Sequence, residues 1–136
     1  MKVVLDYGAI MPTKAHEDDA GFDLYARESQ TVYLYDSAEF DTGVHIEIPR
    51  GYVGFIKSKS GLNIKHGITS EGVIDSGYTG SIRVKLYNNS RESYDVKRGD
   101  KISQLVIMPI CTETLELADS LQKTERGNNG FGSSGK

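Results

Sequence analysis

The chain has 136 residues, 38% of them hydrophobic, no Trp and a formal net charge of -3. This length suits one domain with a modest hydrophobic core, and the acidic balance argues against a general nucleic-acid binder, which is usually basic. Because no run of about 18 apolar residues occurs, the sequence also predicts no transmembrane helix and no membrane partner.

The first half of the chain shows the alternation typical of β-strands. At the N-terminus, the acid Asp6 comes too early for the hydrophobic stretch of a signal peptide. Residues 31–35 are rich in β-branched and aromatic side chains, and residues 44–48 alternate between apolar and polar. Both patterns predict strands, the second with one buried face.

The second half adds one short helix and two further strands. The helix is expected at residues 62–65, directly after a Ser-Gly pair. Residues 81–87 alternate again and predict a strand whose apolar side chains share one face, whereas residues 101–110 form a more continuous apolar run that predicts a buried strand. Turn residues at 41–43, 49–51, 88–90 and 98–100 separate these segments. Short strands with frequent turns favour an all-β barrel or sandwich.

Residues that form disulfides or bind transition metals are few. We expect Cys111 to be a small buried side chain in the last apolar strand. A lone cysteine cannot form an internal disulfide, which favours a reducing, cytoplasmic location. His16, His45 and His66 lack the spacing and the cysteine partners typical of a zinc site.

The glycine-rich segment 126–136 matches two phosphate-binding patterns only superficially. It fits G-x-G-x-x-G and most of a P-loop, but both motifs require a following helix and the sequence ends at Lys136. From composition alone the segment is expected to be a mobile tail. Its glycine N–H groups, serine hydroxyls, Arg126 and Phe131 would also suit a lid that orders over a nucleotide triphosphate.

Five segments, in order, resemble the motifs of the trimeric dUTPase family. They are residues 20–26 (AGFDLYA), 59–62 (KSGL), 72–80 (GVIDSGYTG), 98–105 (RGDKISQL) and the tail 126–135. The resemblance implies a jelly-roll-like β-barrel or clip over residues 1–125, with one short helix and with the flexible tail 126–136 closing over the nucleotide. It further implies a homotrimer whose three active sites are shared between subunits.

The activity implied by the resemblance is Mg²⁺-dependent hydrolysis of dUTP to dUMP and pyrophosphate, which limits uracil incorporation into DNA and supplies dUMP for thymidylate synthesis. Asp75 would hold the water that attacks the α-phosphate, and Asp23 would lie in the second shell of an ion that needs no direct protein ligand. The resemblance assigns substrate contacts to Lys59, Ser60, Gly61, Gly72, Ile74, Tyr78, Gln104, Arg126, Phe131, Gly132 and Ser133.

Several of these residues also have a purely structural interpretation. Asp75 could start a turn, and Tyr78 could be an ordinary strand aromatic. Ser60 with its neighbouring glycine could cap the helix, while Gln104 and Asp23 could be hydrogen-bonded groups that order an apolar strand.

The sequence departs from the family pattern at three places. Lys59 replaces the usual arginine and so loses the bidentate geometry of a guanidinium, Gly77 replaces a frequent second acid, and residues 128–129 are two asparagines in place of smaller residues. Two alternative functions remain open. A dCTP deaminase would need a glutamate in the hairpin, and residues 73–82 contain none; a nucleotide-sensing protein on the same scaffold would not need Asp75.

Overall fold

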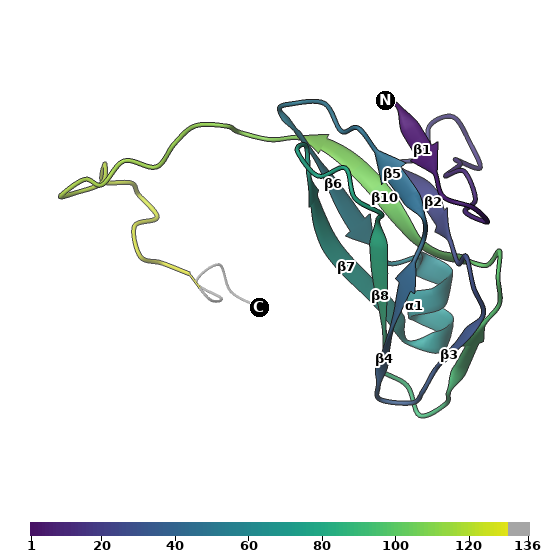
Figure 1. Ribbon diagram of the computed structural model, residues 1–136. Helices are drawn as coiled ribbons and strands as arrows, with labels where there is room; N and C mark the ends of the chain where they lie inside the picture. Colours follow the sequence, from purple (N-terminus) through teal and green to yellow (C-terminus); the bar gives the residue numbers. More distant parts are fainter. Residues whose placement is uncertain (131–136) are drawn as a thin grey trace.

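The computed structural model describes residues 1–130, and residues 131–136 lie outside the description. Within residues 1–130 the chain forms ten β-strands and one helix (Figure 1). In chain order the elements are β1 (Val3–Leu5), β2 (Gly21–Tyr25), β3 (Gln30–Val32), β4 (Ser37–Asp41), β5 (Val44–Ile46), β6 (Tyr52–Lys57), α1 (Ser60–His66), β7 (Ile68–Asp75), β8 (Arg83–Asn88), β9 (Tyr94–Val96) and β10 (Lys101–Pro109). The predicted all-β class with one short helix is confirmed.

The strands pair into one large antiparallel sheet and two small ones. The large sheet has the order β2-β10-β6-β7-β8-β4, while β1 pairs with β5 and β3 with β9. Figure 1 shows β10 running beside β2 and β6, so a strand from the end of the folded body lies between two from its first half. This long-range pairing brings sequence-distant motifs together.

The core lies on the inner face of the curled sheet and follows the predicted alternation. Ile82, just before β8, and Val84 and Leu86, within it, are completely buried, whereas the side chains between them are exposed. Burying an aliphatic side chain of this size contributes about 1.5–3 kcal/mol. Core residues from other strands include Leu24, Val32, Phe40, Val44, Ile56, Ile68, Ile102 and Leu105. The alternating pattern therefore fixes which face of each strand is inside.

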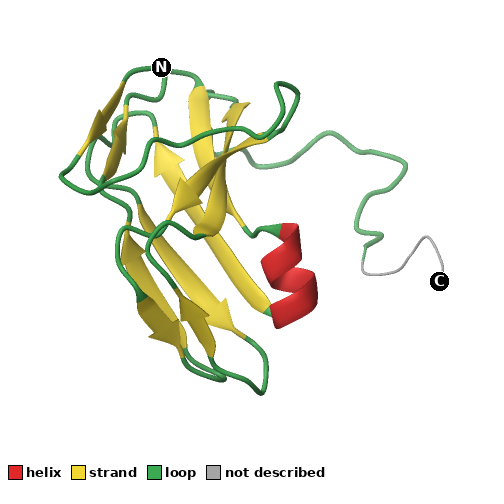
Figure 2. Ribbon diagram, turned by 90° about the vertical axis from the view of Figure 1, so that its right-hand side faces the viewer, coloured by secondary structure: helices red, strands yellow, loops and turns green. Residues whose placement is uncertain are grey.

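The helix begins two residues before the predicted start and ends one residue after the predicted end. Lys59 precedes it in an extended conformation, and the helix ends at Gly67, whose φ of 66° is in the left-handed region that favours glycine. Leu62 packs against the core, which holds this short helix beside the long strands of the large sheet (Figure 2).

Two expectations were wrong. The strand expected at residues 31–35 ends at Val32, and the chain turns through Tyr33 to Tyr35, where Tyr35 has a φ of 54°. Cys111 is exposed rather than buried, because β10 ends at Pro109 and the chain then leaves the sheet. Aromatic and apolar composition alone did not indicate where either strand ends.

Beyond β10 the chain extends away from the folded body (Figure 1). The Ile110 N–H still donates to the Gly51 carbonyl at 2.9 Å, but residues 111–129 are exposed along their whole length. Three leucines in this stretch are almost fully accessible: Leu115, Leu117 and Leu121. A segment with this composition has apolar groups available for contacts outside its own folded body.

Candidate active site

One outer face of the large sheet carries three of the predicted polar residues. Gln104 of β10 lies opposite Asp23 of β2 on one side and Lys57 of β6 on the other. Lys57 in turn pairs with Glu71 of β7, and Asp75 lies four residues further along that strand. Since side chains alternate with a period of two, Asp23, Gln104 and Asp75 all point away from the core.

Asp23 is a buried carboxylate that forms ion pairs with two lysines. Its Oδ2 lies 2.7 Å from Nζ of Lys101, and its Oδ1 accepts from Nζ of Lys59. Burial raises the pKa of Asp23, but the hydrogen bonds and charges of Lys101 and Lys59 outweigh burial and hold the pKa below its ordinary value. The same contact raises the pKa of Lys101. Both carboxylate oxygens are thereby occupied by ammonium groups.

Gln104 lies at this lysine cluster. Its Nε2 donates to the carbonyl of Ser58 at 3.1 Å, which is the structural hydrogen bond expected for an amide in an apolar strand. Gly21 leaves room for the amide, since a Cβ there would lie 2.8 Å from Gln104 Oε1. Next to this point, Ser60 opens α1 without a side-chain cap, and open space surrounds Gly61. The backbone at Ser60 and Gly61 is thus accessible to a ligand.

The turn between β7 and β8 holds Asp75 and Tyr78. The Tyr78 N–H donates to the Asp75 carbonyl at 3.0 Å, and the Tyr78 hydroxyl donates to the Ser81 carbonyl at 2.9 Å. The tyrosine ring crosses Gly80 so closely that a Cβ there would lie 2.5 Å from its Oη. Asp75 is exposed at the end of its strand. The turn therefore presents a free carboxylate beside an internally bonded aromatic ring.

The edge of β7 above this turn has no strand partner. β8 pairs with β7 only at residues 68–70 of β7, whereas its other edge pairs with β4 over residues 83–87. At residues 71–75, β7 pairs with β6 on one side alone. Gly72 and Ile74 have their side-chain positions on the core side, next to Ile56 and to Gly54. Their backbone groups, rather than their side chains, are what this segment offers to a ligand.

The predicted residues form two groups in one chain. Around Asp23 lie Lys59, Ser60, Gly61 and Gln104; along β7 and its turn lie Gly72, Ile74, Asp75 and Tyr78. Gln104 and Asp75 are four residues apart along the sheet and two strands apart across it, a separation of about 16 Å. A single chain therefore does not bring the two groups together.

The remaining predicted residues belong to the C-terminal segment. Arg126 is exposed, and its Nε donates to the carbonyl of Asn129 at 2.9 Å. Phe131, Gly132 and Ser133 lie outside the described residues.

Lys101 is a participant that the sequence did not single out. It directly follows the turn that ends at Asp100, and only the β2–β10 register places it at Asp23. An acid within an apolar strand is a usable signal for such a partner, because a buried carboxylate requires a cation or hydrogen-bond donors.

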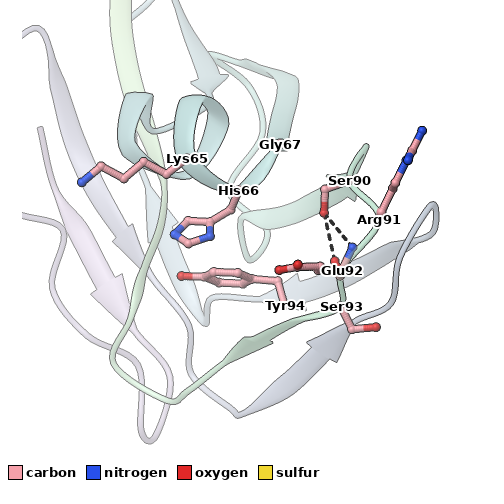
Figure 3. Close-up of a pocket in the computed structure, with 8 residues that line it drawn as sticks. All are labelled: Lys65, His66, Gly67, Ser90, Arg91, Glu92, Ser93 and Tyr94. Carbon is pink, nitrogen blue, oxygen red and sulfur yellow. Dashed lines mark hydrogen bonds between the residues drawn. The ribbon is translucent and has the colours of Figure 1, made fainter.

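A separate hollow of about 360 Å³ lies between the end of α1 and the loop before β9 (Figure 3). The His66 and Tyr94 rings pack against one another in it, tilted by 54° and with centroids 4.9 Å apart. The Ser90 hydroxyl donates to the Glu92 carbonyl, so the polar groups that line the hollow here stabilise the local turn (Figure 3). None of the predicted site residues lines this hollow.

Residues 1–130 contain neither a clustered metal site nor a membrane-spanning helix. No group of three or more His, Cys, Asp or Glu side chains in this part of the chain is placed to hold a metal ion. Nor does any helix there have the length and apolarity needed to cross a membrane.

The chain is similar in sequence to proteins of one known family. The family model described as dUTPase matches residues 8–135. The deoxyuridine 5'-triphosphate nucleotidohydrolase of Leifsonia xyli is 43% identical over 129 residues, which cover 92% of this chain and 85% of the relative. The enzyme of the same name from Candida albicans is 40% identical, with 93% and 81% covered.

Solved structures agree with the sequence relatives. The dUTPase of Staphylococcus bacteriophage 80alpha with dUPNHPP superposes with a TM-score of 0.93 at 32% identity, covering 99% of this chain and 98% of the phage chain. A D95N mutant dUTPase from phage phi11, described with a structural Mg(II) ion, gives a TM-score of 0.82 at 31% identity, with 88% and 96% covered.

The curled antiparallel sheets and the one helix formed by residues 1–130 are therefore those of the jelly-roll-like nucleotidohydrolases. Within that class, the chain belongs to the dUTPase family. The predicted family and the jelly-roll-like fold are both confirmed.

Proposed function

We propose that the protein hydrolyses dUTP to dUMP and pyrophosphate, and so limits uracil incorporation into DNA. Family membership and the names of relatives at about 40% identity support this activity. The observation that carries it is the exposed Asp75 carboxylate at the end of a strand whose free backbone edge leads to Tyr78.

In the proposed reaction Asp75 holds and deprotonates a water. The water oxygen forms a bond to the α-phosphorus, its proton passes to the Asp75 carboxylate, and the bond from the α-phosphorus to the bridging oxygen breaks, releasing pyrophosphate. A carboxylate is only a weak base toward water. Its main contribution is therefore to place the water in line with phosphorus.

The open edge of β7 suits recognition of the uracil ring. Free N–H and C=O groups near Gly72 and Ile74 can pair with the ring edge as a base partner would, and a base with the opposite donor order would leave buried groups unmatched. Tyr78, fixed to the Ser81 carbonyl, would pack against the deoxyribose and leave no room for a 2′-hydroxyl.

The triphosphate would lie at the second group of residues. Ser60 and the Gly61 backbone are accessible, and Gln104 lies beside them. Mg²⁺ keeps several waters and takes other oxygens from phosphates, so it would be carried by the triphosphate and supply charge neutralisation there. Asp23, with both oxygens on lysines, would chiefly orient Lys59 and Lys101 toward the bound anion.

A homotrimer would solve the separation of the two groups, because Asp75 of one subunit could meet the Ser60–Gln104 group of another. The outer face of the sheet supports such an assembly. Val73 is 61% exposed there, and Phe55 is half-buried beside it. An exposed apolar face of this kind is typical of an interface. The tail containing Arg126 and Phe131 would then close over the nucleotide as a lid.

The deciding experiment measures pyrophosphate and ammonia release from dUTP, dCTP, dTTP and UTP in the presence of Mg²⁺. We expect pyrophosphate from dUTP, far less from the other three nucleotides, and no ammonia. Ammonia from dCTP would indicate a deaminase, and binding of dUTP without any product would indicate a nucleotide sensor. Either result contradicts the proposed hydrolysis.

A further inference from the structure

We propose that His45 is a positioning residue that ties the turn between β7 and β8 to the N-terminal strand. This inference rests on the proposed function, since that turn carries Asp75 and Tyr78. The tether itself is a property of the unliganded fold and can be measured without any substrate.

The imidazole of His45 bridges two segments that are distant in sequence. Its Nδ1 lies 2.8 Å from the Thr79 carbonyl, and its Nε2 lies 3.3 Å from Oδ1 of Asp6. β5 itself is anchored, because His45 pairs with Val4 of β1. The side chain is 27% exposed, so it lies between the two segments rather than on the open surface.

The chemistry of these partners selects the protonated ring. The Thr79 carbonyl and the Asp6 carboxylate both accept hydrogen bonds, and a neutral imidazole has only one N–H to donate. Only the imidazolium of His45 satisfies both. Consistent with this geometry, the bond to Thr79 and the charge of Asp6 raise the pKa of His45 above its ordinary 6.5.

Other charges surround the ring on several elements. Asp41, at the end of β4, adds a further negative charge, while Arg27 lies 3.3 Å from Oδ2 of Asp6 and shares that carboxylate. Lys2 and Glu47 line the same surface and pair with each other at 3.2 Å. The net surroundings of the imidazole are acidic, so the double tether is complete below about pH 6.5. It weakens as the pH rises through the elevated pKa of the folded protein.

Loss of the tether would act on the site through the turn. Thr79 lies between Tyr78 and Gly80, the pair whose close packing sets the position of the aromatic ring. When the Thr79 carbonyl loses its donor, the turn becomes more mobile. The Tyr78 ring, which would contact the sugar, and the Asp75 carboxylate, which would hold the water, then become more mobile as well. We expect the KM for dUTP to rise by about fivefold, the effect of one hydrogen bond, with a smaller change in kcat.

The test compares His45→Gln, His45→Leu and a control, His16→Leu, which removes an exposed histidine from the N-terminal loop. His45→Gln can still donate to Thr79 but does not titrate, and His45→Leu removes both bonds. Without substrate, NMR gives the pKa of His45 in the wild type and the amide exchange rates of residues 77–81 in all proteins. We expect a pKa above 6.5, exchange about fivefold faster in His45→Leu, and near wild-type exchange in His45→Gln and His16→Leu.

The kinetic arm measures pyrophosphate release from dUTP against pH in the same proteins. The substrate titrates identically in all of them, so a wild-type rise in KM above pH 6.5 that is missing in His45→Gln belongs to His45. Unchanged exchange and an unchanged pH profile in His45→Leu would overturn the tether. Absence of pyrophosphate release from the wild type would instead overturn the proposed function, and the exchange rates would still decide the tether.

Discussion

The Lys101 ammonium lies 2.7 Å from Oδ2 of Asp23, so the end of the β-body is fixed electrostatically to its beginning. Asp23 is 5% exposed, and its other oxygen accepts a hydrogen bond from a second ammonium group, that of Lys59. A carboxylate at this depth is stable in its charged form only because both cations are present. The contact thus supports the β2–β10 pairing and arranges two positive charges beside the candidate phosphate site.

Replacing Asp23 by Asn removes the charge that both lysines face, and we expect a loss of about 2 kcal/mol in the free energy of unfolding. The lowered pKa of Asp23 stabilises the fold above pH 3.8, and that contribution is lost as the pH falls through the folded-state pKa. Urea unfolding between pH 3 and pH 7 should therefore show a shallower pH dependence in Asp23→Asn. Glu47→Gln breaks a well-exposed ion pair with Lys2 and should change little.

Replacing Asp75 by Asn should slow pyrophosphate release by about 10²–10⁴-fold, because the amide cannot accept the proton of the water. Binding of dUTP and the thermal unfolding temperature should stay close to wild type, since Asp75 is exposed at a strand end. Stopped-flow product release and calorimetry measure the two effects. Glu71→Gln, an exposed acid on the same strand, is the control, and full activity in Asp75→Asn would remove Asp75 from the mechanism.

Replacing Gly80 by Ala should displace the Tyr78 ring, because the new methyl would lie 2.5 Å from the tyrosine oxygen. We expect the KM for dUTP to rise about tenfold and the preference for dUTP over UTP to fall. Gly77→Ala is a matched control in the same turn, since a Cβ there meets no atom within 4 Å. Equal kinetics for the two variants would show that the ring position does not determine sugar selection.

Replacing Val73 by Glu should dissociate the proposed trimer, since a charge would then replace an apolar side chain on the outer face of the sheet. Light scattering after size exclusion gives the mass directly. Ile64→Glu, at an 83% exposed position on the helix, should leave the mass unchanged. A monomeric wild type, or an unaffected mass in Val73→Glu, would contradict an interface on this face.

Deleting residues 126–136 should reduce turnover strongly and leave the oligomer intact, if the tail acts as the lid that we propose. Residues 126–129 are exposed and the next described residue is a glycine, so their removal takes no core side chain from the fold. Product release and light scattering on one preparation separate these effects. Unchanged turnover would discard the lid.

The sequence predicted those parts of the molecule that depend on local pattern. Alternation around Val84 and Leu86 predicted a strand with a buried face, and β8 has that face. The segment through Tyr35 has equally strand-like side chains but turns at a positive φ, because composition does not specify where pairing stops. The Asp23–Lys101 and His45–Thr79 contacts depend on strand register and turn placement, which emerge only when distant segments pair.

The unpartnered edge of β7 also has a consequence for handling the protein. Exposed strand edges are templates for pairing with other chains, which leads to aggregation. Residues 71–75 combine such an edge with the apolar Val73 and Ile74. The charge of Glu71, at one end of this segment, opposes pairing with another chain. A nucleotide paired along this edge would occupy the same backbone groups, so substrate analogues should also improve solubility during purification and storage.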